Sequence, residues 1–381
     1  MRTSPLQKRT ALASGLLLVL AACTGPTSAP DPDGPGPQPG IDRAFRMGFT
    51  PWPYAATAEA VDDVYEKIRR HGDLTVHHLD AGVPWPEAAA GEPYHSAVEA
   101  ELATRIARSP SDRPLYLSIA PLNSRRDGLA DYWGSSAGLP RPGEWADRSF
   151  SHPAVIEAYI NYALDLIERF RPDYFNYGIE ASELILSNPE AFDEFVGFAA
   201  SVYGAVKAAH PSLPTFLSVG LKHPESGGTS LLIGQLERVS AFTDMVGISA
   251  YPYVFFGHED AGDPAKLPDD WLTQARRLLP GKPLAIAETG WIAETLTIPA
   301  FSVHVTANAA RQRDFVEQLL TAANEETVEF VVWFFIQDFD DLWKNVLSED
   351  PVAAIWRDTG LYDENGETRP GLDVWEEWRA R

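Results

Sequence analysis

Eight short apolar segments recur along the chain, and helical patterns lie between most of them. Proline, glycine, aspartate or asparagine bounds each segment, which is typical of strands buried in a parallel sheet. Eight strands alternating with helices favour a closed barrel over an open doubly wound sheet. The predicted fold class is therefore α/β, a single (β/α)8 TIM barrel. The expected strands are Phe45–Thr50, Leu74–Asp80, Leu115–Pro121, Tyr174–Glu180, Thr215–Gly220, Met245–Tyr251, Leu284–Thr289 and Phe330–Gln337.

Helix signals between these segments support the same fold. Asn188-Pro189 and Asp263-Pro264 each pair a capping side chain with a proline at the first helical position. No Gly-x-Gly-x-x-Gly turn follows the first segment, which weakens a nucleotide-binding alternative. Among the expected helices are Glu59–His71, Ala154–Phe170, Ala191–His210 and Arg311–Asn324.

The first residues have the pattern of a targeting segment. Three basic residues precede the apolar run Ala11–Ala22, which is too short to span a bilayer as a permanent helix. The run ends Leu-Ala-Ala-Cys at Cys23, which resembles the bacterial lipobox. Residues 1–22 are therefore predicted to be a lipoprotein signal peptide and Cys23 the lipidated residue. The alternative is an ordinary secretory signal with an incidental cysteine.

The residues that follow indicate a flexible tether, and together with the signal peptide they predict where the protein is located. Residues 23–43 are rich in proline and glycine and cannot bury a core, so they predict a flexible tether before a catalytic barrel at residues 44–381. We expect a monomer on the bacterial cell envelope, held to the membrane by its lipid and facing the periplasm or the exterior. Because Cys23 is the only cysteine, its lipidation leaves no thiol for a disulfide, catalysis or a metal.

The charge balance excludes some partners. The chain has 31 Lys and Arg residues against 54 Asp and Glu residues. An acidic chain of this kind is a poor partner for nucleic acid or for an anionic membrane surface, and the acidity itself favours solubility.

Two glutamates, Glu180 and Glu288, close the fourth and seventh apolar segments. The active site of a (β/α)8 barrel lies at the carboxyl ends of its strands. A buried ionised glutamate is unfavourable without partners, so two at strand ends favour a functional explanation. The alternative is that each is a structural carboxylate in a salt bridge or a loop cap.

Strand alternation makes the orientation of these glutamates testable, because side chains two residues apart share a face. If Glu180 points into the barrel, Gly178 and Asn176 should do so as well. If Glu288 points in, Ile286 and Leu284 should follow. On the last strand, Trp333, Phe335 and Gln337 should share one face.

Histidine and tryptophan residues near strand ends are candidate sugar contacts. His77 and His78 should point to opposite faces, so they cannot chelate a metal together, and no metal site is expected. With Asp80, one of them can reach a sugar hydroxyl or the nucleophile, although a structural histidine fits equally well. Flat aromatic faces stack on sugars. Of the tryptophans at strand ends or in the loops after them, three or four are expected to contact substrate and the rest to pack; these tryptophans are Trp52, Trp85, Trp133, Trp145, Trp291, Trp333 and Trp343.

Several motifs together resemble the clan A glycoside hydrolases, which are retaining (β/α)8 enzymes. Glu288 within Ala-Glu-Thr-Gly-Trp is similar to the nucleophile strand, notably of endo-β-1,4-galactanases and β-1,3-glucanases. Glu180 matches the acid/base position. Tyr251, which closes Gly-Ile-Ser-Ala-Tyr, resembles a tyrosine that often bonds the nucleophile, and Trp333 resembles the strand-eight tryptophan beneath the cleaved sugar. The resemblance spans residues 44–381.

This resemblance implies a retaining double-displacement hydrolysis of a β-linked poly- or oligosaccharide without a cofactor. Glu180 and Glu288 would be catalytic. Tyr251 should favour the ionised form of Glu288, and a drier environment should raise the pKa of Glu180. The implied substrate-binding residues are Trp52, His78, Asp80, Trp85, Asn176, Tyr251, Trp291, Trp333 and Gln337.

One departure from the family pattern keeps two alternatives open. The family usually carries asparagine immediately before the acid/base, whereas this chain has Ile179. One alternative is a non-catalytic carbohydrate-binding barrel on a lipoprotein. The other is an inverting or otherwise different barrel hydrolase that uses Asp80 or Glu87.

Overall fold

The computed structural model describes residues 42–257 and 260–381. The predicted signal peptide, the lipidation site at Cys23 and nearly all of the predicted tether lie outside the described residues. Among the described residues, no helix combines the length and the apolar character needed to cross a bilayer.

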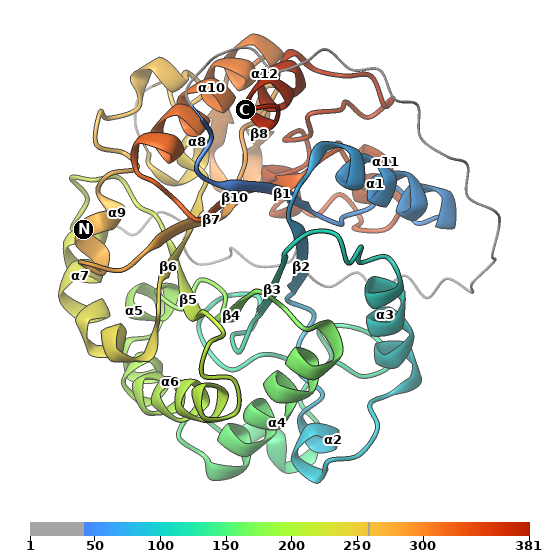
Figure 1. The fold of residues 1–381 in the computed structure, drawn as a ribbon, viewed down its shortest axis with the longest axis vertical. Helices are drawn as coiled ribbons and strands as arrows, with labels where there is room; N and C mark the ends of the chain where they lie inside the picture. The colour runs from blue at the N-terminus through green and yellow to red at the C-terminus, as the bar shows by residue number, and fades with distance from the viewer. Residues whose placement is uncertain (1–41, 258–259) are drawn as a thin grey trace.

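Eight parallel strands form the barrel, in the spatial order β1-β10-β7-β6-β5-β4-β3-β2 (Figure 1). The backbone N–H of Leu74, just before β2, donates to the carbonyl of Met47 on β1 over 3.0 Å and so links the two ends of the sheet. The predicted (β/α)8 barrel is confirmed. The strands are β1 Arg46–Thr50, β2 Thr75–Leu79, β3 Leu115–Ile119, β4 Tyr174–Gly178, β5 Thr215–Gly220, β6 Val246–Ala250, β7 Leu284–Thr289 and β10 Phe330–Phe335.

Helices surround the sheet, and small additions lie in the loops. The predicted cap at Asn188 is present, since its Oδ1 accepts from the backbone N–H of Ala191 over 3.2 Å. β8 (Leu296–Ile298) and β9 (Val303–Val305) form an antiparallel hairpin after β7. The α-helices are α1 Ala58–His71, α2 Trp85–Ala90, α3 Ser96–Ala107, α4 Pro153–Phe170, α5 Glu183–Ser187, α6 Pro189–Ala209, α7 Gly227–Leu236, α8 Pro252–Phe255, α9 Ala275–Leu278, α10 Ala309–Glu325, α11 Asp340–Asn345 and α12 Pro370–Arg379.

The first strand and the last helix pack against each other. The ring of Phe45, just before β1, stacks on Trp378 at 6.1 Å, and Phe49 in β1 lies 4.7 Å from Trp375, both tryptophans belonging to α12. On its sheet edge β1 pairs with β10 in parallel register. The beginning and end of the barrel therefore hold one another in place.

The core has two parts. One cluster fills the inside of the barrel and includes Tyr116, Phe216, Ala287 and Val332. A much larger cluster lies between the sheet and its helices and includes Leu284, Ile286 and Trp333.

Irregular strand pairing explains which residues face inward near the carboxyl ends. The pairing shifts by one residue where Ile286 and Glu288 of β7 lie opposite Ile248 and Ser249 of β6. Such a bulge interrupts the two-residue alternation. The expectation that Leu284 and Ile286 share the inner face with Glu288 is therefore wrong.

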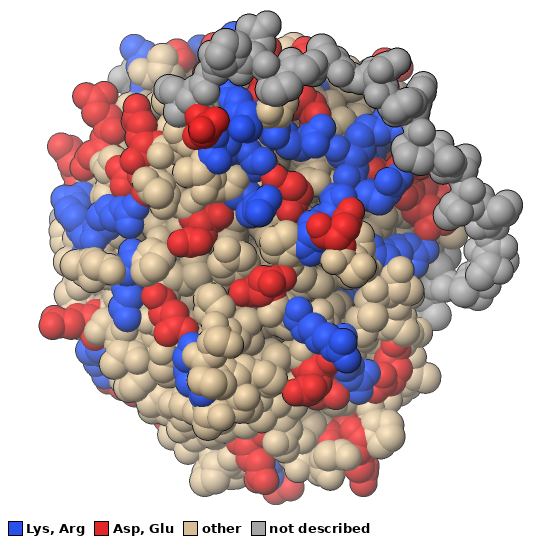
Figure 2. Space-filling view, in the orientation of Figure 1, with Lys and Arg blue, Asp and Glu red and all other residues tan. Residues whose placement is uncertain are grey.

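The view in Figure 1 looks along the barrel, and the strands follow one another clockwise. Right-handed crossovers then place the amino ends of the strands toward the viewer. Figure 2, in the same orientation, shows basic and acidic side chains side by side on this face. A cavity of about 570 Å³ opens between Arg46, Lys207 and Asp244. It lies at the amino ends of the strands, away from the carboxyl ends that bear Glu180 and Glu288.

Candidate active site

Glu180 lies in a turn directly after β4, with its backbone in the left-handed region at φ +49°. Its backbone N–H donates to the hydroxyl of Ser218 over 2.9 Å. Its carboxylate accepts from Ser249 Oγ at 2.7 Å on Oε1 and from Arg126 Nε at 3.1 Å on Oε2. With 23% of the side chain exposed, Glu180 is held by fixed donors and remains open to solvent.

Glu288 lies on β7 and is more deeply buried, with 9% of its side chain exposed. The hydroxyl of Tyr251 donates to its Oε1 over 2.7 Å. Nδ1 of His78, on β2, lies 3.9 Å from its Oε2. The expected hydrogen bond from Tyr251 to the candidate nucleophile is present, and of the two histidines it is His78 that lies near Glu288.

Ser249 connects the two glutamates. It is the pairing partner of Glu288 across β6 and β7, and its hydroxyl donates to Glu180. Both carboxyl groups therefore lie at the carboxyl end of the barrel, where the fold places active sites, and the charge of Glu180 is near enough to raise the pKa of Glu288.

Arg126 is a site residue that the sequence did not reveal. It lies in the loop after β3, with its side chain 9% exposed and its backbone at φ +55°. Its two terminal nitrogens reach the carboxylate of Asp80 at 3.0 and 2.6 Å, while its Nε serves Glu180. Because Asp80 is engaged in this way, its place in the site is beside the acid/base candidate rather than the nucleophile.

The charges favour an order of titration opposite to the one expected from the sequence. Burial pushes the pKa of Glu180 upward, but Arg126, Ser249 and Lys222 outweigh it and hold that pKa below its ordinary value. Burial raises the pKa of Glu288 well above its ordinary value, and the Glu180 carboxylate adds to this rise. Of the two carboxyl groups, Glu180 therefore loses its proton more readily, and the expectation of a raised pKa for Glu180 is wrong.

Two neighbours complete the electrostatic picture. Burial lowers the pKa of His78 to about 4, so this imidazole is neutral at pH 7. Burial also raises the pKa of Glu183, which lies 2.7 Å from Nζ of Lys222. A neutral His78 leaves Tyr251 as the hydrogen-bond donor that the structure gives to Glu288.

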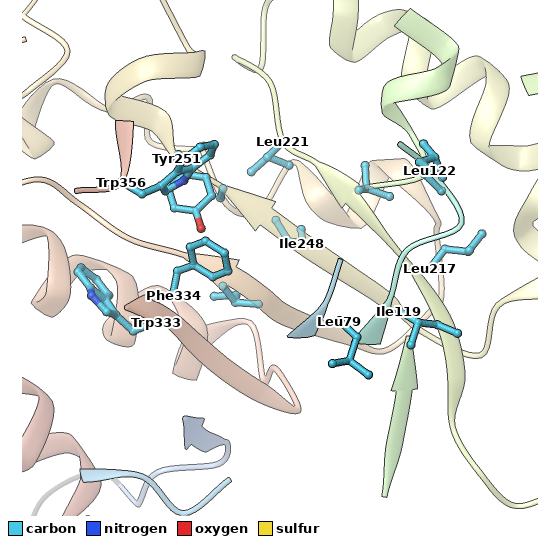
Figure 3. Packing of buried hydrophobic residues seen from close by; sticks show 14 of the residues in the cluster. Leu79, Ile119, Leu122, Leu217, Leu221, Ile248, Tyr251, Trp333, Phe334 and Trp356 are labelled. Carbon is cyan, nitrogen blue, oxygen red and sulfur yellow. The ribbon is translucent and has the colours of Figure 1, made fainter. Parts of the chain in front are cut away.

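Phe334, not Trp333, is the aromatic residue of β10 on the site side (Figure 3). Its ring lies edge-on to His78 at 5.4 Å and to Tyr251 at 6.1 Å. Trp333 is 0% exposed, and its indole N–H donates to the carbonyl of Thr359 on the far side of the strand. The structure thus contradicts a sugar-contacting role for Trp333.

Four more predicted sugar contacts are engaged in packing. Trp85 is 0% exposed and bonds the carbonyl of Ala130. Trp291 is also 0% exposed and stacks on Phe315 at 4.4 Å. The other two, which hydrogen-bond with Tyr116 and Lys67 respectively, are Asn176 and Gln337.

The remaining predicted contact is Trp52, after β1. It is partly buried, and its ring lies 5.3 Å from Phe335. Trp52 therefore stays a candidate at the rim. The prediction that His77 and His78 face opposite sides is confirmed, since His77 packs on Phe170 of α4 at 5.1 Å.

Carboxylates also gather after β10, but arginines occupy the space between them. Oxygens of Asp338, Asp340 and Asp358 lie within 4.8 Å of one another. Arg369 lies 2.6 Å from Asp338, and Arg357 binds Asp358 with two nitrogens at 2.7 Å. These guanidinium groups supply the positive charge that a cation would otherwise provide.

Comparisons with known proteins give a consistent fold. No protein-family model matches the chain, and no curated protein matches its sequence. The GH53 catalytic domain of Ignisphaera aggregans matches with a TM-score of 0.58 at 18% identity, over 90% of this chain and 98% of that one. The exo-β-1,4-mannosidase Op5Man5 of Opitutaceae bacterium strain TAV5 matches with a TM-score of 0.60 at 15% identity, over 93% of this chain and 62% of that one. Xylanase 10B of Thermotoga maritima matches with a TM-score of 0.55 at 12% identity, over 88% of this chain and 94% of that one. These solved structures are glycoside hydrolases of clan GH-A, and at such identities the likeness concerns the fold.

Proposed function

We propose that this protein is a retaining glycoside hydrolase that cleaves a β-linked poly- or oligosaccharide. The observation that carries the proposal is that Glu180 and Glu288 lie at the carboxyl ends of β4 and β7, where Ser249, the strand-pairing partner of Glu288, donates to Glu180. Two carboxyl groups in this relation match the chemistry of glycoside cleavage. The fold alone would not support the proposal, because barrels host many reactions.

The chemistry runs in two displacements. Glu180 protonates the leaving oxygen while Glu288 attacks the anomeric carbon and forms a glycosyl-enzyme. Glu180 then takes a proton from the water that releases the sugar. Tyr251 stabilises the Glu288 carboxylate through its 2.7 Å hydrogen bond. Because the pKa of Glu180 lies below its ordinary value and that of Glu288 lies above it, the reactive form carries its proton on the less favoured of the two carboxyl groups.

The first residues of the chain support a proposed cellular location for the enzyme. The apolar run and Cys23 support export and a lipid anchor in the bacterial cell envelope. The barrel would act there as a monomer on glycans outside the cytoplasm, without a cofactor. Mass spectrometry of the protein from a bacterial membrane fraction tests the anchor, because lipidation adds mass at Cys23 that Cys23→Ala removes.

A substrate screen tests the activity. Wild type and Glu288→Gln are incubated in parallel with β-glucans, galactans, mannans and xylans, and released reducing ends are measured. Wild type should release product from one class, and Glu288→Gln should release none. Product release by both proteins would remove Glu288 from the mechanism.

A non-catalytic carbohydrate-binding barrel is the second candidate. Ile179 stands where the resembled family has asparagine, and both oxygens of Glu180 already have donors. Under this proposal calorimetry detects glycan binding by wild type and by Glu288→Gln, and neither protein yields product. An inverting enzyme has less support, since Asp80 binds Arg126 and Glu87 accepts from Tyr132 at 2.6 Å.

A further inference from the structure

We propose that Arg126 is a positioning residue shared between Asp80 and Glu180, and that Asp80 retains the guanidinium whenever Glu180 gains its proton. This inference rests on the proposed function, because it takes Glu180 as the acid/base. It assigns Asp80 to the protonation cycle rather than to sugar binding or nucleophilic attack.

The division of the Arg126 hydrogen bonds supports this role. Asp80, with a side chain 3% exposed, receives Nη1 at 3.0 Å and Nη2 at 2.6 Å. Glu180 receives only Nε, at 3.1 Å. A paired fork is stronger than a single bond, so the fixed partner of Arg126 is Asp80. Glu180 can therefore exchange its one bond for a proton without leaving a buried arginine unpaired, which would cost several kcal/mol.

The loop that carries Arg126 is tied to the segment that follows Glu180. The hydroxyl of Ser187, in α5, donates to the carbonyl of Arg126 over 2.6 Å. The amide of Asn188 donates to the carbonyl of Asp127 over 2.8 Å. The guanidinium and the Glu180 carboxylate are thus held relative to each other by two side-chain bonds outside the charged cluster.

The backbones of Arg126 and Glu180 both lie in the left-handed region, at φ +55° and +49°. This conformation is unfavourable for a residue other than glycine, because its Cβ crowds the following carbonyl oxygen. Two such residues in direct contact indicate that the position of their side chains is what the surrounding structure maintains.

A second cation near Glu180 has its own carboxylate in the same way. Nζ of Lys222 lies 2.7 Å from Oε1 of Glu183. Gly220 makes room for this pair, because a Cβ there would lie 2.3 Å from that same oxygen. Both cations beside Glu180 therefore have a counterion, and neither depends on Glu180 for neutrality.

The other charged or titratable groups that face Glu180 are accounted for. Glu288 lies on β7 and accepts from Tyr251 of the neighbouring turn. His78 on β2 is neutral at pH 7. Within the described part of the chain, the Asp80–Arg126 ion pair reaches the Glu180 carboxylate directly, through Nε of Arg126. Changing these two residues should therefore move the titration of Glu180 in opposite directions.

The test is a direct titration of the Glu180 carboxyl in the full chain. Carboxyl carbons are observed by NMR with ¹³C-labelled glutamate, and Glu180→Gln identifies the resonance. Arg126→Gln should raise the Glu180 midpoint by about 1–3 pH units, because an opposite charge has been removed. Asp80→Asn should lower the midpoint, because the whole guanidinium field then acts on Glu180. Equal shifts in one direction, or no shift, would overturn the proposal.

A double variant covers the case in which Arg126→Gln does not fold because the buried Asp80 carboxylate loses the Arg126 guanidinium. Asp80→Asn/Arg126→Gln replaces the ion pair by two neutral amides, and its Glu180 midpoint should lie above that of wild type. A midpoint equal to wild type would overturn the proposal as well.

Activity separates this inference from the proposed function. If wild type cleaves a glycan, the midpoint of the acidic limb in the pH profile of kcat/KM should shift to higher pH in Arg126→Gln. The same midpoint should shift to lower pH in Asp80→Asn. Opposite NMR shifts without turnover on any glycan would support the proposed role of Arg126 and Asp80 and contradict the proposed glycosidase function. Turnover without opposite shifts would support the glycosidase function and contradict the proposed role of Arg126 and Asp80.

Discussion

The hydroxyl of Tyr251, which follows β6, donates to Oε1 of Glu288 on β7 over 2.7 Å. This bond favours the ionised form of a carboxyl whose pKa burial otherwise raises well above its ordinary value. The hydrogen bond from Tyr251 thus opposes burial, which is the largest influence on the pKa of the candidate nucleophile Glu288.

Removing that hydroxyl should slow the enzyme. Tyr251→Phe should raise the pKa of Glu288 further and lower kcat/KM by about 10–100-fold, the equivalent of one hydrogen bond to a charged group. Tyr253→Phe is the matched control, because its equally buried hydroxyl donates to the carbonyl of Ile355 over 2.8 Å. Equal losses in both variants would assign Tyr251 to stability alone.

The spacing of the catalytic carboxyl groups should identify the stereochemistry. In a crystal structure Glu180 and Glu288 should stand about 5–5.5 Å apart, as in retaining enzymes. A separation of about 6.5–9.5 Å would indicate inversion. A 2-fluoro glycoside should also leave a covalent sugar on Glu288, which peptide mass spectrometry detects.

An external nucleophile should rescue the loss of the acid/base. Glu180→Ala should still form the glycosyl-enzyme from aryl glycosides with good leaving groups, but it should release the sugar slowly. Azide should then accelerate turnover and give a glycosyl azide. An azide-insensitive variant with the pH profile of wild type would show that Glu180 is not the acid/base.

The two neighbouring aromatics of β10 should separate binding from stability. Phe334→Leu keeps apolar volume but loses a flat face, so substrate affinity should fall by about 2–10-fold. Trp333→Leu should leave affinity unchanged and lower the free energy of unfolding by a few kcal/mol, as for other large core residues. Calorimetric binding and urea unfolding on both variants measure this contrast.

His78 should make stability depend on pH. Its pKa is lowered to about 4 by burial, so between pH 6.5 and 4 the unfolded chain binds a proton that the folded protein does not. Stability is therefore lost as pH falls through that range, by about 3 kcal/mol for this group. His78→Gln should lose correspondingly less between pH 7 and 4 in urea titrations. Parallel curves for the two proteins would contradict a neutral, buried His78.

The sequence was sufficient for the barrel and for the strand ends that bear Glu180 and Glu288. The apolar pattern of a strand and the residues that bound it can be read from neighbouring positions in the sequence. Predicted strands such as Thr215–Gly220 and Leu284–Thr289 therefore agree with the structure to the residue. The inward face of β10 was predicted wrongly. The pairing of β1 and β10 shifts by one residue at the carboxyl end, and strand alternation cannot anticipate such a bulge.

Arg126 could not be found from sequence for a related reason. It lies seven residues beyond the end of β3, in a loop with no regular period, and only the folded chain brings it to Asp80 and Glu180. The same arginine reversed the expected order of the two pKa values. Tertiary electrostatics, rather than local pattern, decides that order.

The packing of β1 against α12 has a consequence for the order of folding. Phe45 and Phe49 obtain their partners Trp378 and Trp375 only when the last helix has been made, more than 300 residues later. Contacts so distant in sequence form slowly, because a long loop must close first. During synthesis the early strands therefore remain part of an incomplete barrel. The barrel can close only after α12 has left the ribosome.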